Sequence, residues 1–205
     1  SSDKTIFDND FPKTKFSETS INPRLALKYQ LEVPLTLRAN VGTGFRAPYG
    51  FSEDLHLCSG SPRVWKSSDL EAETSHSFNF SADYYGDHYQ LKANLFYTKL
   101  KNKIDFADAD DEVKKLGCTY QWENIDDALV KGIELSFLVN PIKDLNFGID
   151  YTINSGKYNN KRADWIDTDY ADVSQYIPRF PVTTGSVKLE YNPSTWTFMI
   201  NGIYQ

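Results

Sequence analysis

Long hydrophobic runs are missing from this sequence, and their absence excludes a membrane-spanning helix within its 205 residues. No run of consecutive apolar residues exceeds three, as at Phe137 to Val139. A transmembrane helix needs roughly 20 such residues. A strand that spans a bilayer needs only about 9 to 11 residues with every second one apolar, so a mean hydropathy of -0.52 is compatible with a membrane wall built from strands.

Histidine and basic clusters are also scarce. The three histidines, His56, His76 and His88, lie far apart, and the chain contains neither a Gly-x-Ser-x-Gly elbow nor a phosphate-binding loop. We therefore expect no enzyme activity, no catalytic residue and no cofactor. The 22 Lys and Arg residues are outnumbered by 28 Asp and Glu residues and form no basic cluster, which argues against nucleic-acid binding.

Metal-ligating patterns are weak. His56 and Cys58, with Asp54 nearby, make only part of a zinc site, which usually needs four ligands. Acidic residues in two loops could hold calcium, but their spacing is not that of an EF-hand and a solvated acidic loop explains them better. These are Asp108, Asp110, Asp111, Glu112, Asp164, Asp167, Asp169 and Asp172. We expect no metal site.

The chain is rich in aromatic residues, and its apolar residues recur at every second position of the predicted strands. Aromatics make up 15% of the sequence, and six of them lie beside short polar connections: Tyr29, Tyr84, Tyr85, Tyr89, Tyr191 and Trp196. Apolar side chains alternate with polar ones along each predicted strand, with Phe96 as an exception. The polar face carries charges at Arg38, Lys92, Glu134, Asp150, Lys188 and Glu190. An aromatic girdle and a two-faced strand pattern are typical of the wall of a membrane β-barrel.

Short and long connections alternate along the chain. The short ones are expected at residues 31–34, 86–88, 140–144 and 192–194, and the long ones at 46–73, 106–119 and 155–181. Bacterial outer-membrane barrels show this asymmetry, with short periplasmic turns and long extracellular loops. The prediction is an all-β, antiparallel up-and-down barrel wall of about nine strands, one of them a long strand from near residue 120 to 139. A soluble β-sandwich stays open as an alternative, in which the apolar face would form a closed core that contains Phe78, Phe80, Ile133 and Phe137.

Four segments, in this order, carry a family resemblance. They are Gly44-Phe45-Arg46-Ala47-Pro48 with Glu53-Asp54-Leu55 after it, Leu70-Glu71-Ala72-Glu73-Thr74-Ser75, the spaced residues Asn124, Ala128, Gly132 and Glu134, and Ile177-Pro178-Arg179-Phe180-Pro181. Together they resemble the C-terminal part of the barrel of TonB-dependent outer-membrane receptors, although Ala72 stands where that family usually has Pro. The resemblance extends over about residues 21–205.

The resemblance implies a 22-stranded barrel that is closed by a plug domain and imports a scarce nutrient with energy relayed by TonB. Residues 1–205 would be a fragment of a single β-barrel domain, without the plug, in the bacterial outer membrane. The implied partners are outer-membrane lipid, TonB, the plug and a small cargo: an iron-siderophore, haem or a cobalamin-like corrinoid, with a sugar as the next possibility. A passive porin or an adhesin barrel remains the alternative.

Candidate contacts follow from residue type and position. Trp165, Tyr170 and Tyr176 in the last long loop are candidates for packing on a cargo, because aromatic anchors commonly dominate binding. Packing of these rings against neighbouring loops is the alternative. Arg46, at the end of a strand, could bind an anionic ligand or pair with a loop carboxylate, and the pairing is the favoured interpretation.

Glycines and cysteines give two further expectations. Gly42, Gly44 and Gly132 fall on the polar face, where a missing side chain leaves room for a plug or a neighbouring backbone. Cys58 and Cys118 fall in different long loops on the same side and could form a disulfide if their Cα atoms come within about 7 Å.

Overall fold

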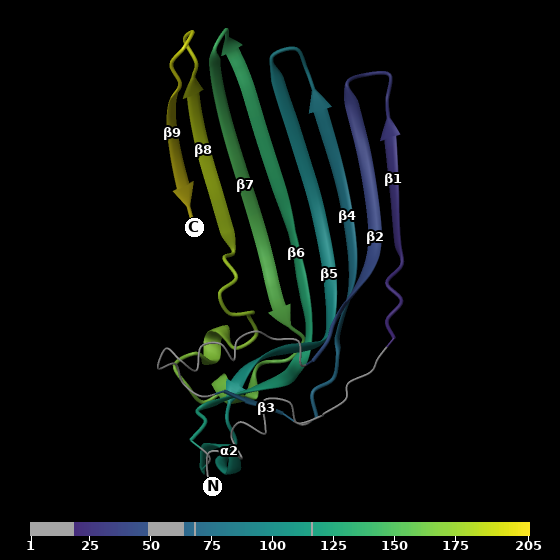
Figure 1. Cartoon of the computed structure of the whole chain (residues 1–205), viewed down its shortest axis with the longest axis vertical. Coiled ribbons are helices and arrows are strands. Elements are labelled where there is room, and N and C mark those ends of the chain that lie inside the picture. Colours follow the sequence, from purple (N-terminus) through teal and green to yellow (C-terminus); the bar gives the residue numbers. More distant parts are fainter. Residues whose placement is uncertain (1–18, 49–63, 68, 116) are drawn as a thin grey trace.

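The protein forms one curved antiparallel sheet, seen in a computed structural model that describes residues 19–48, 64–67, 69–115 and 117–205. Eight strands follow one another across the sheet (Figure 1): β1 (Arg24–Gln30), β2 (Leu35–Arg46), β4 (Glu73–Tyr85), β5 (Tyr89–Asp108), β6 (Tyr120–Ile142), β7 (Leu145–Tyr158), β8 (Thr183–Tyr191) and β9 (Phe198–Tyr204). Every neighbouring pair in this path is antiparallel. The predicted up-and-down topology is confirmed.

The count of wall strands is eight in the described residues rather than about nine, although the sheet as a whole has nine strands there. The extra one, β3 (Val64–Lys66), pairs in parallel with residues 120–122 at the start of β6. It lies at the loop end and does not extend the wall (Figure 1). The predicted long strand is present as β6, which has 23 residues.

Short turns and long loops lie at opposite ends of the strands, with the turns at the top of Figure 1 and the loops at the bottom. Two of the turns contain a non-glycine residue with positive φ, Asp144 (68°) between β6 and β7, and Ser194 (59°) between β8 and β9. Asp tolerates this left-handed conformation better than most residues, because its short side chain can hydrogen-bond locally. The six aromatics named above gather at this turn end, where the rings of Tyr84 and Tyr89 stack with centroids 5.5 Å apart.

One face of the wall is apolar and open. Leu95 of β5 lies between Phe80 of β4 and Ile133 of β6 in one row across the sheet. Phe78 is 48% exposed and Ile133 is 42% exposed. A sandwich core would bury these side chains, so the described residues do not form the sandwich that the sequence left open. No helix in the described part of the chain is long and apolar enough to cross a bilayer.

The other face carries cross-strand pairs of polar side chains. Arg38 of β2 pairs with Asp83 of β4. Further along the sheet, Asn94 donates a hydrogen bond to Glu134 (2.9 Å). Along β8, Lys188 pairs with Glu190. Across strands, polar contacts continue at Ser77 with Thr98 and at Ser186 with Asp150. Such pairs are neighbours across a sheet and stabilise it. The predicted division into an apolar and a polar face therefore holds from β2 to β8.

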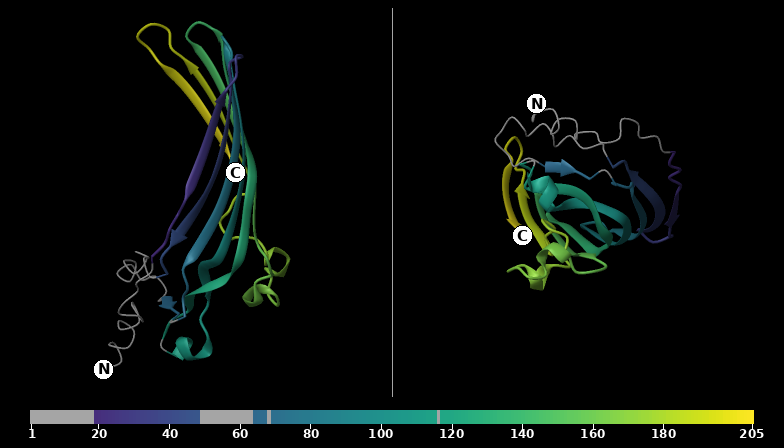
Figure 2. Two further views of the ribbon diagram at one scale, coloured as in Figure 1. Left: turned by 90° about the vertical axis from the view of Figure 1, so that its right-hand side faces the viewer. Right: turned by 90° about the horizontal axis from the view of Figure 1, so that it is seen from below.

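The buried core lies at the loop end of the wall rather than between two layers. Leu70, Ile104 and Trp122 pack together there, and the ring of Phe106 lies 3.7 Å from that of Trp122 between centroids. A second small cluster joins Ala109, Val113 and Cys118 with Trp65, beneath helix α2 (Asp111–Lys115). Figure 2 shows how β5 and β6 continue past the rest of the wall to reach this region. We call these two clusters, together with the ends of β5 and β6 that carry them, the platform.

Candidate functional site

The platform is held together by Asn124, which connects segments far apart in the sequence. Its Oδ1 accepts a hydrogen bond from the Glu71 backbone N–H (2.8 Å). Its Nδ2 donates to the backbone carbonyl oxygens of Glu71 (3.1 Å) and Asn102 (2.7 Å). Asn124 of β6 therefore ties together the segment just before β4 and the loop-side part of β5.

Asn102 lies in a bulge of β5 whose backbone groups need hydrogen-bond partners from outside the ladder. The register of β5 against β6 shifts between Leu100 and Lys103, and Asn102 in this bulge has a φ of 53°. An extra residue in a strand leaves backbone groups without ladder partners. Here the Asn102 backbone N–H donates to Asp127 (3.1 Å) and its carbonyl accepts from Asn124. The bulge is satisfied by side chains, and it bends the strand end into the platform.

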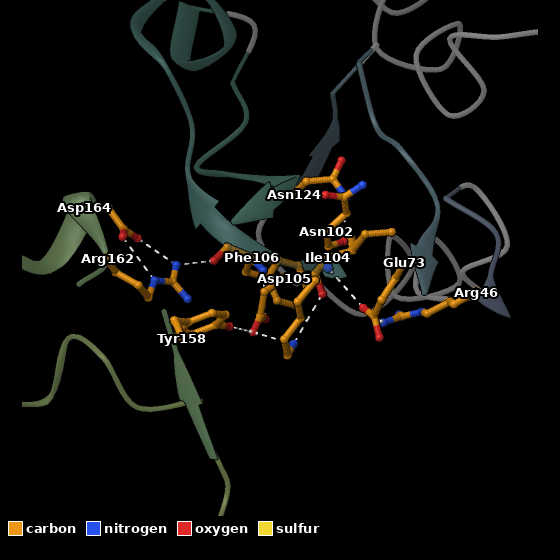
Figure 3. Close-up of polar contacts among 11 residues, drawn as sticks. Arg46, Glu73, Asn102, Ile104, Asp105, Phe106, Asn124, Tyr158, Arg162 and Asp164 are labelled. Carbon is orange, nitrogen blue, oxygen red and sulfur yellow. Dashed lines mark hydrogen bonds and ion pairs between the residues drawn. The ribbon is translucent and has the colours of Figure 1, made fainter. Parts of the chain in front are cut away.

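Arg46 and Glu73 face each other at the last rung between β2 and β4. Their Cα atoms are register partners, and a guanidinium nitrogen lies 3.7 Å from the carboxylate. Glu73 also accepts a hydrogen bond from the Ile104 backbone N–H (3.1 Å), as Figure 3 shows. Of the two interpretations for Arg46, the structure shows the carboxylate pairing.

Asp105, Tyr158 and Lys103 form a polar cluster beside this rung (Figure 3). The Tyr158 hydroxyl donates to Asp105 (2.6 Å), and Lys103 lies 3.0 Å from the same carboxylate oxygen. Burial alone would raise the pKa of Asp105, but the hydrogen bond from Tyr158 and the nearby Lys103 outweigh it and lower the pKa. Burial, followed by the hydrogen bond to Asp105, raises the pKa of Tyr158. The pair therefore stays as carboxylate and phenol near neutral pH.

Arg162 anchors the last long loop to the platform. Only 4% of this residue is exposed. Its guanidinium donates two hydrogen bonds to Asp164 (3.1 and 2.8 Å) and one to the Phe106 carbonyl. Burial would lower the pKa of Arg162, but the hydrogen bonds to Asp164 outweigh it and raise the pKa. A buried, doubly paired guanidinium of this kind fixes the geometry of the loop around it.

Two of the three candidate loop aromatics come together on this anchor. Trp165, at the end of helix η2 (Ala163–Trp165), lies with its ring 4.4 Å from the Arg162 guanidinium and 5.8 Å from the ring of Tyr170. Tyr176 lies elsewhere, after helix η3 (Ala171–Val173), with the Lys157 ammonium 4.5 Å from its ring. In Figure 2 the loop that contains both helices lies outside the curve of the wall. The four predicted contact residues are thus distributed over three places.

A polar hollow of about 330 Å³ lies between this loop and the platform. Acidic, basic and amide side chains line it: Asp108, Glu123, Asp126, Asn160, Lys161, Arg162 and Asp164. Asn160 is already bound to Asp126 through its backbone N–H (2.7 Å). Within the described ranges, no three His, Cys, Asp or Glu side chains are placed to hold a metal ion. The arrangement offers hydrogen-bond donors and acceptors to a small polar molecule.

Comparison with known proteins decides the family. The sequence profile described as "TonB dependent receptor-like, beta-barrel" matches residues 1–205. This chain belongs to the TonB-dependent receptor β-barrel family. No curated protein matches the chain.

Several solved structures share the fold of this chain. The siderophore receptor PirA from Pseudomonas aeruginosa superposes with a TM-score of 0.64 at 20% identity, over 89% of this chain and 34% of its own. The copper transporter OprC gives 0.62 at 18% identity, over 85% of this chain and 24% of its own. The FrpB iron transporter from Neisseria meningitidis (F3-3 variant) gives 0.60 at 13% identity, over 88% and 25%. The chain therefore spans about a quarter to a third of the length of these proteins.

Of the residues that carried the resemblance to TonB-dependent receptors, those that the structure describes lie in the platform and wall, whereas residues 53–55 lie outside the described ranges. Pro48, Leu70 and Ala128 are buried. Asn154 donates hydrogen bonds to the carbonyl oxygens of Val182 and Pro181, which closes the return of the last loop onto the wall. Gly44, Phe45, Gly132 and Glu134 lie within the ladders of β2 and β6, and Pro178 lies in the same loop return as Pro181. In this TonB-dependent receptor wall these residues shape the scaffold that carries the loops.

Sequence reasoning missed the residues that anchor the loops of this receptor wall. Asp105, Tyr158 and Arg162 occupy no motif, and their contacts span 53 and 56 positions. The one sequence signal for these contacts was a polar residue near the end of a strand, as at Asp105. Cys58 lies outside the described residues, whereas Cys118 is buried beneath α2. The disulfide stays a prediction.

Proposed function

We propose that this chain is part of the wall of an outer-membrane receptor that imports a scarce nutrient with energy delivered through TonB. The observation that carries the proposal is the two-faced wall, with its loop platform at one end only. An open apolar face suits lipid, and a ladder of paired polar side chains suits a lumen that holds water and a plug domain. Membership of this family supports TonB and a plug domain as partners and the bacterial outer membrane as the location.

The proposed cargo is a metal chelate, such as an iron-siderophore, with haem or a cobalamin-like corrinoid as alternatives. Similar folds belong to proteins named as a siderophore receptor, a copper transporter and an iron transporter. The paired rings of Trp165 and Tyr170, held on Arg162, supply a rigid aromatic contact for a flat or apolar ligand. Arg46 supplies a contact for an anionic group, since 42% of its side chain is exposed beside Glu73.

Uptake measurements test active import against a passive porin. Cells that produce the full-length protein are given a radiolabelled ferric siderophore, in matched strains with and without TonB. Active import predicts uptake only in the strain with TonB. Equal uptake in both strains would instead support the passive porin.

Binding measurements test the aromatic contact. The full-length variant W165A/Y170A should lose at least about tenfold in affinity for the same ferric siderophore, because rigid aromatic anchors carry much of a binding energy. Y176A serves as the matched control, since the ring of Tyr176 contacts Lys157 and lies apart from the pair. Unchanged affinity in the double variant would remove both rings from the proposed site.

A further inference from the structure

A cluster of lysines lies on the apolar side of the wall, just beyond the apolar belt on the loop side. Lys99 of β5 and Lys157 of β7 flank Leu129 of β6 in a single row. Lys131 lies on the same face of β6, two residues from Leu129, because every second residue of a strand shares a face. On the turn side of this cluster come Tyr97 and Ile133, which are exposed apolar residues.

The lysines are close enough to act on one group. Strand spacing puts the Cα atoms of Lys99 and Lys157 about 10 Å apart, and those of Lys99 and Lys131 about 8 Å apart. Lysine side chains of about 6 Å can converge from such positions on a single anion. Lys99 and Lys131 are exposed. Asp127, a carboxylate on the same face, accepts a hydrogen bond from the Asn102 backbone N–H (3.1 Å).

An apolar hollow of about 530 Å³ lies on the same face, nearer the turn end. It forms where the small side chains of Ala82 and Ala93 stand side by side between larger ones, including Tyr84, Leu91 and Leu135. Ala93 precedes Lys99 by six residues on β5, a distance of about 20 Å along the strand. With the usual tilt of about 40°, this corresponds to a depth of about 15 Å, which is half of the hydrocarbon core.

We propose that this face binds a phosphorylated lipid of the outward-facing leaflet. Lys99, Lys131 and Lys157 hold the phosphate, and one acyl chain lies in the hollow over Ala82 and Ala93. Charge complementarity between a lysine cluster and anionic headgroups favours this occupant. The depth of the hollow in the bilayer is one that an acyl chain attached to such a headgroup reaches. The inference rests on the proposed function, because it requires the wall to stand in the membrane with its loops outward.

Native mass spectrometry of the full-length protein in detergent tests the lysines. The probes are dioleoyl phosphatidic acid and dioleoylglycerol, which differ by the phosphate. We expect the wild type to retain phosphatidic acid over dioleoylglycerol, and K99Q/K131Q/K157Q to lose at least about tenfold of that retention, since each lysine near an anionic lipid contributes about 1 kcal/mol. The charge-matched control K28Q/K114Q/K115Q should retain the lipid like the wild type, because these lysines lie on the polar face and in α2. Equal retention by the two triple variants would overturn the proposal.

Two further arms separate a lipid from a free anion. The variant A82L/A93L fills the hollow, so its affinity for dioleoyl phosphatidic acid should fall while its affinity for dihexanoyl phosphatidic acid stays unchanged. Displacement of phosphatidic acid by inorganic phosphate at equal concentration would mean that the lysines bind an anion without its chain, which also overturns the proposal. Urea midpoints of all variants verify that each one is folded.

Failure of this inference is distinguishable from failure of the proposed function. Membrane fractionation and TonB-dependent uptake report on the receptor itself and are measured on the same variants. If the protein is in the outer membrane and imports cargo, but replacing the three lysines leaves lipid retention unchanged, only the proposed lipid site is wrong. If the wild type is absent from membranes, the proposed function fails first.

Discussion

The ring of Phe96 lies over Gly132 of the neighbouring strand. The two residues are register partners between β5 and β6. A Cβ atom at Gly132 would lie 2.5 Å from Cζ of Phe96 and 2.3 Å from the backbone carbonyl oxygen of Ile153. Phe96 is the residue that interrupts the apolar alternation of β5, and Gly132 belongs to the polar face. The exception in the pattern and the glycine therefore explain each other: the ring fills the space that the missing side chain leaves.

Replacing Gly132 by Ala should destabilise the wall by about 1–3 kcal/mol, the usual range for overpacking. Gly148→Ala is the matched control, because a Cβ there meets Leu138 at an ordinary 3.6 Å. The measurement is the urea unfolding midpoint of the full-length protein in detergent, with the double variant F96A/G132A alongside. The double variant should remain less stable than F96A, since the clash with the Ile153 carbonyl persists. A Gly132→Ala variant as stable as Gly148→Ala would contradict the packing argument.

Replacing Asn124 by Ala should loosen the platform locally. The substitution removes three hydrogen bonds to Glu71 and Asn102, each worth about 0.5–1.5 kcal/mol, and leaves the backbone of the bulge partly unsatisfied. Hydrogen exchange by mass spectrometry should show faster exchange of the Glu71 amide, with the amides of β7 unchanged. Asn94→Ala, which removes one side-chain bond on the polar face, should leave the Glu71 amide protected.

The last long loop should become less protected in acid. The pKa of Asp105 is lowered in the folded protein, so its stabilising contribution is complete above the unfolded pKa of about 3.9 and is lost as the pH falls through the folded pKa. Hydrogen exchange of residues 159–177, corrected for intrinsic rates, should therefore rise below about pH 4. Tyr158→Phe removes one cause of the lowered pKa, so the folded pKa moves up toward the unfolded value, and the rise should be smaller and complete at a higher pH than in the wild type. Identical pH profiles for Tyr158→Phe and wild type would show that the hydrogen bond does not affect the titration of Asp105.

The predicted disulfide between Cys58 and Cys118 has a direct test. A bridge would close a loop of about 60 residues and stabilise the loop end by roughly 4 kcal/mol in the chain-entropy estimate. Titration of the non-reduced, denatured protein with a thiol reagent should then find no thiol, and two after reduction. Two thiols before reduction would refute the bridge.

Local patterns in the sequence determined the wall. Alternation in β5 and β6 sets which side chains belong to the apolar face and which to the polar face, and the turn residues near Asp144 set where the chain reverses. Both signals depend on neighbours within a few positions, so they can be read without knowing the fold. The motif around Asn124 also indicated the family. The sequence did not show that the side chain of Asn124 binds the backbone of Glu71 and Asn102.

Only the tertiary structure decided which polar residues meet at the loop end. Tyr158 reaches Asp105 across 53 positions, and Arg162 reaches the Phe106 carbonyl across 56. These contacts depend on the register of three strands. The register of β5 against β6 changes only locally at the bulge, because Ile104 opposite Asn124 restores the offset of Leu100 opposite Ala128. A one-residue change in register turns every side chain of a strand to the other face, so the alternation alone cannot place such partners. The same registers brought Lys99, Lys131 and Lys157 together, because they set where neighbouring strands stand opposite one another.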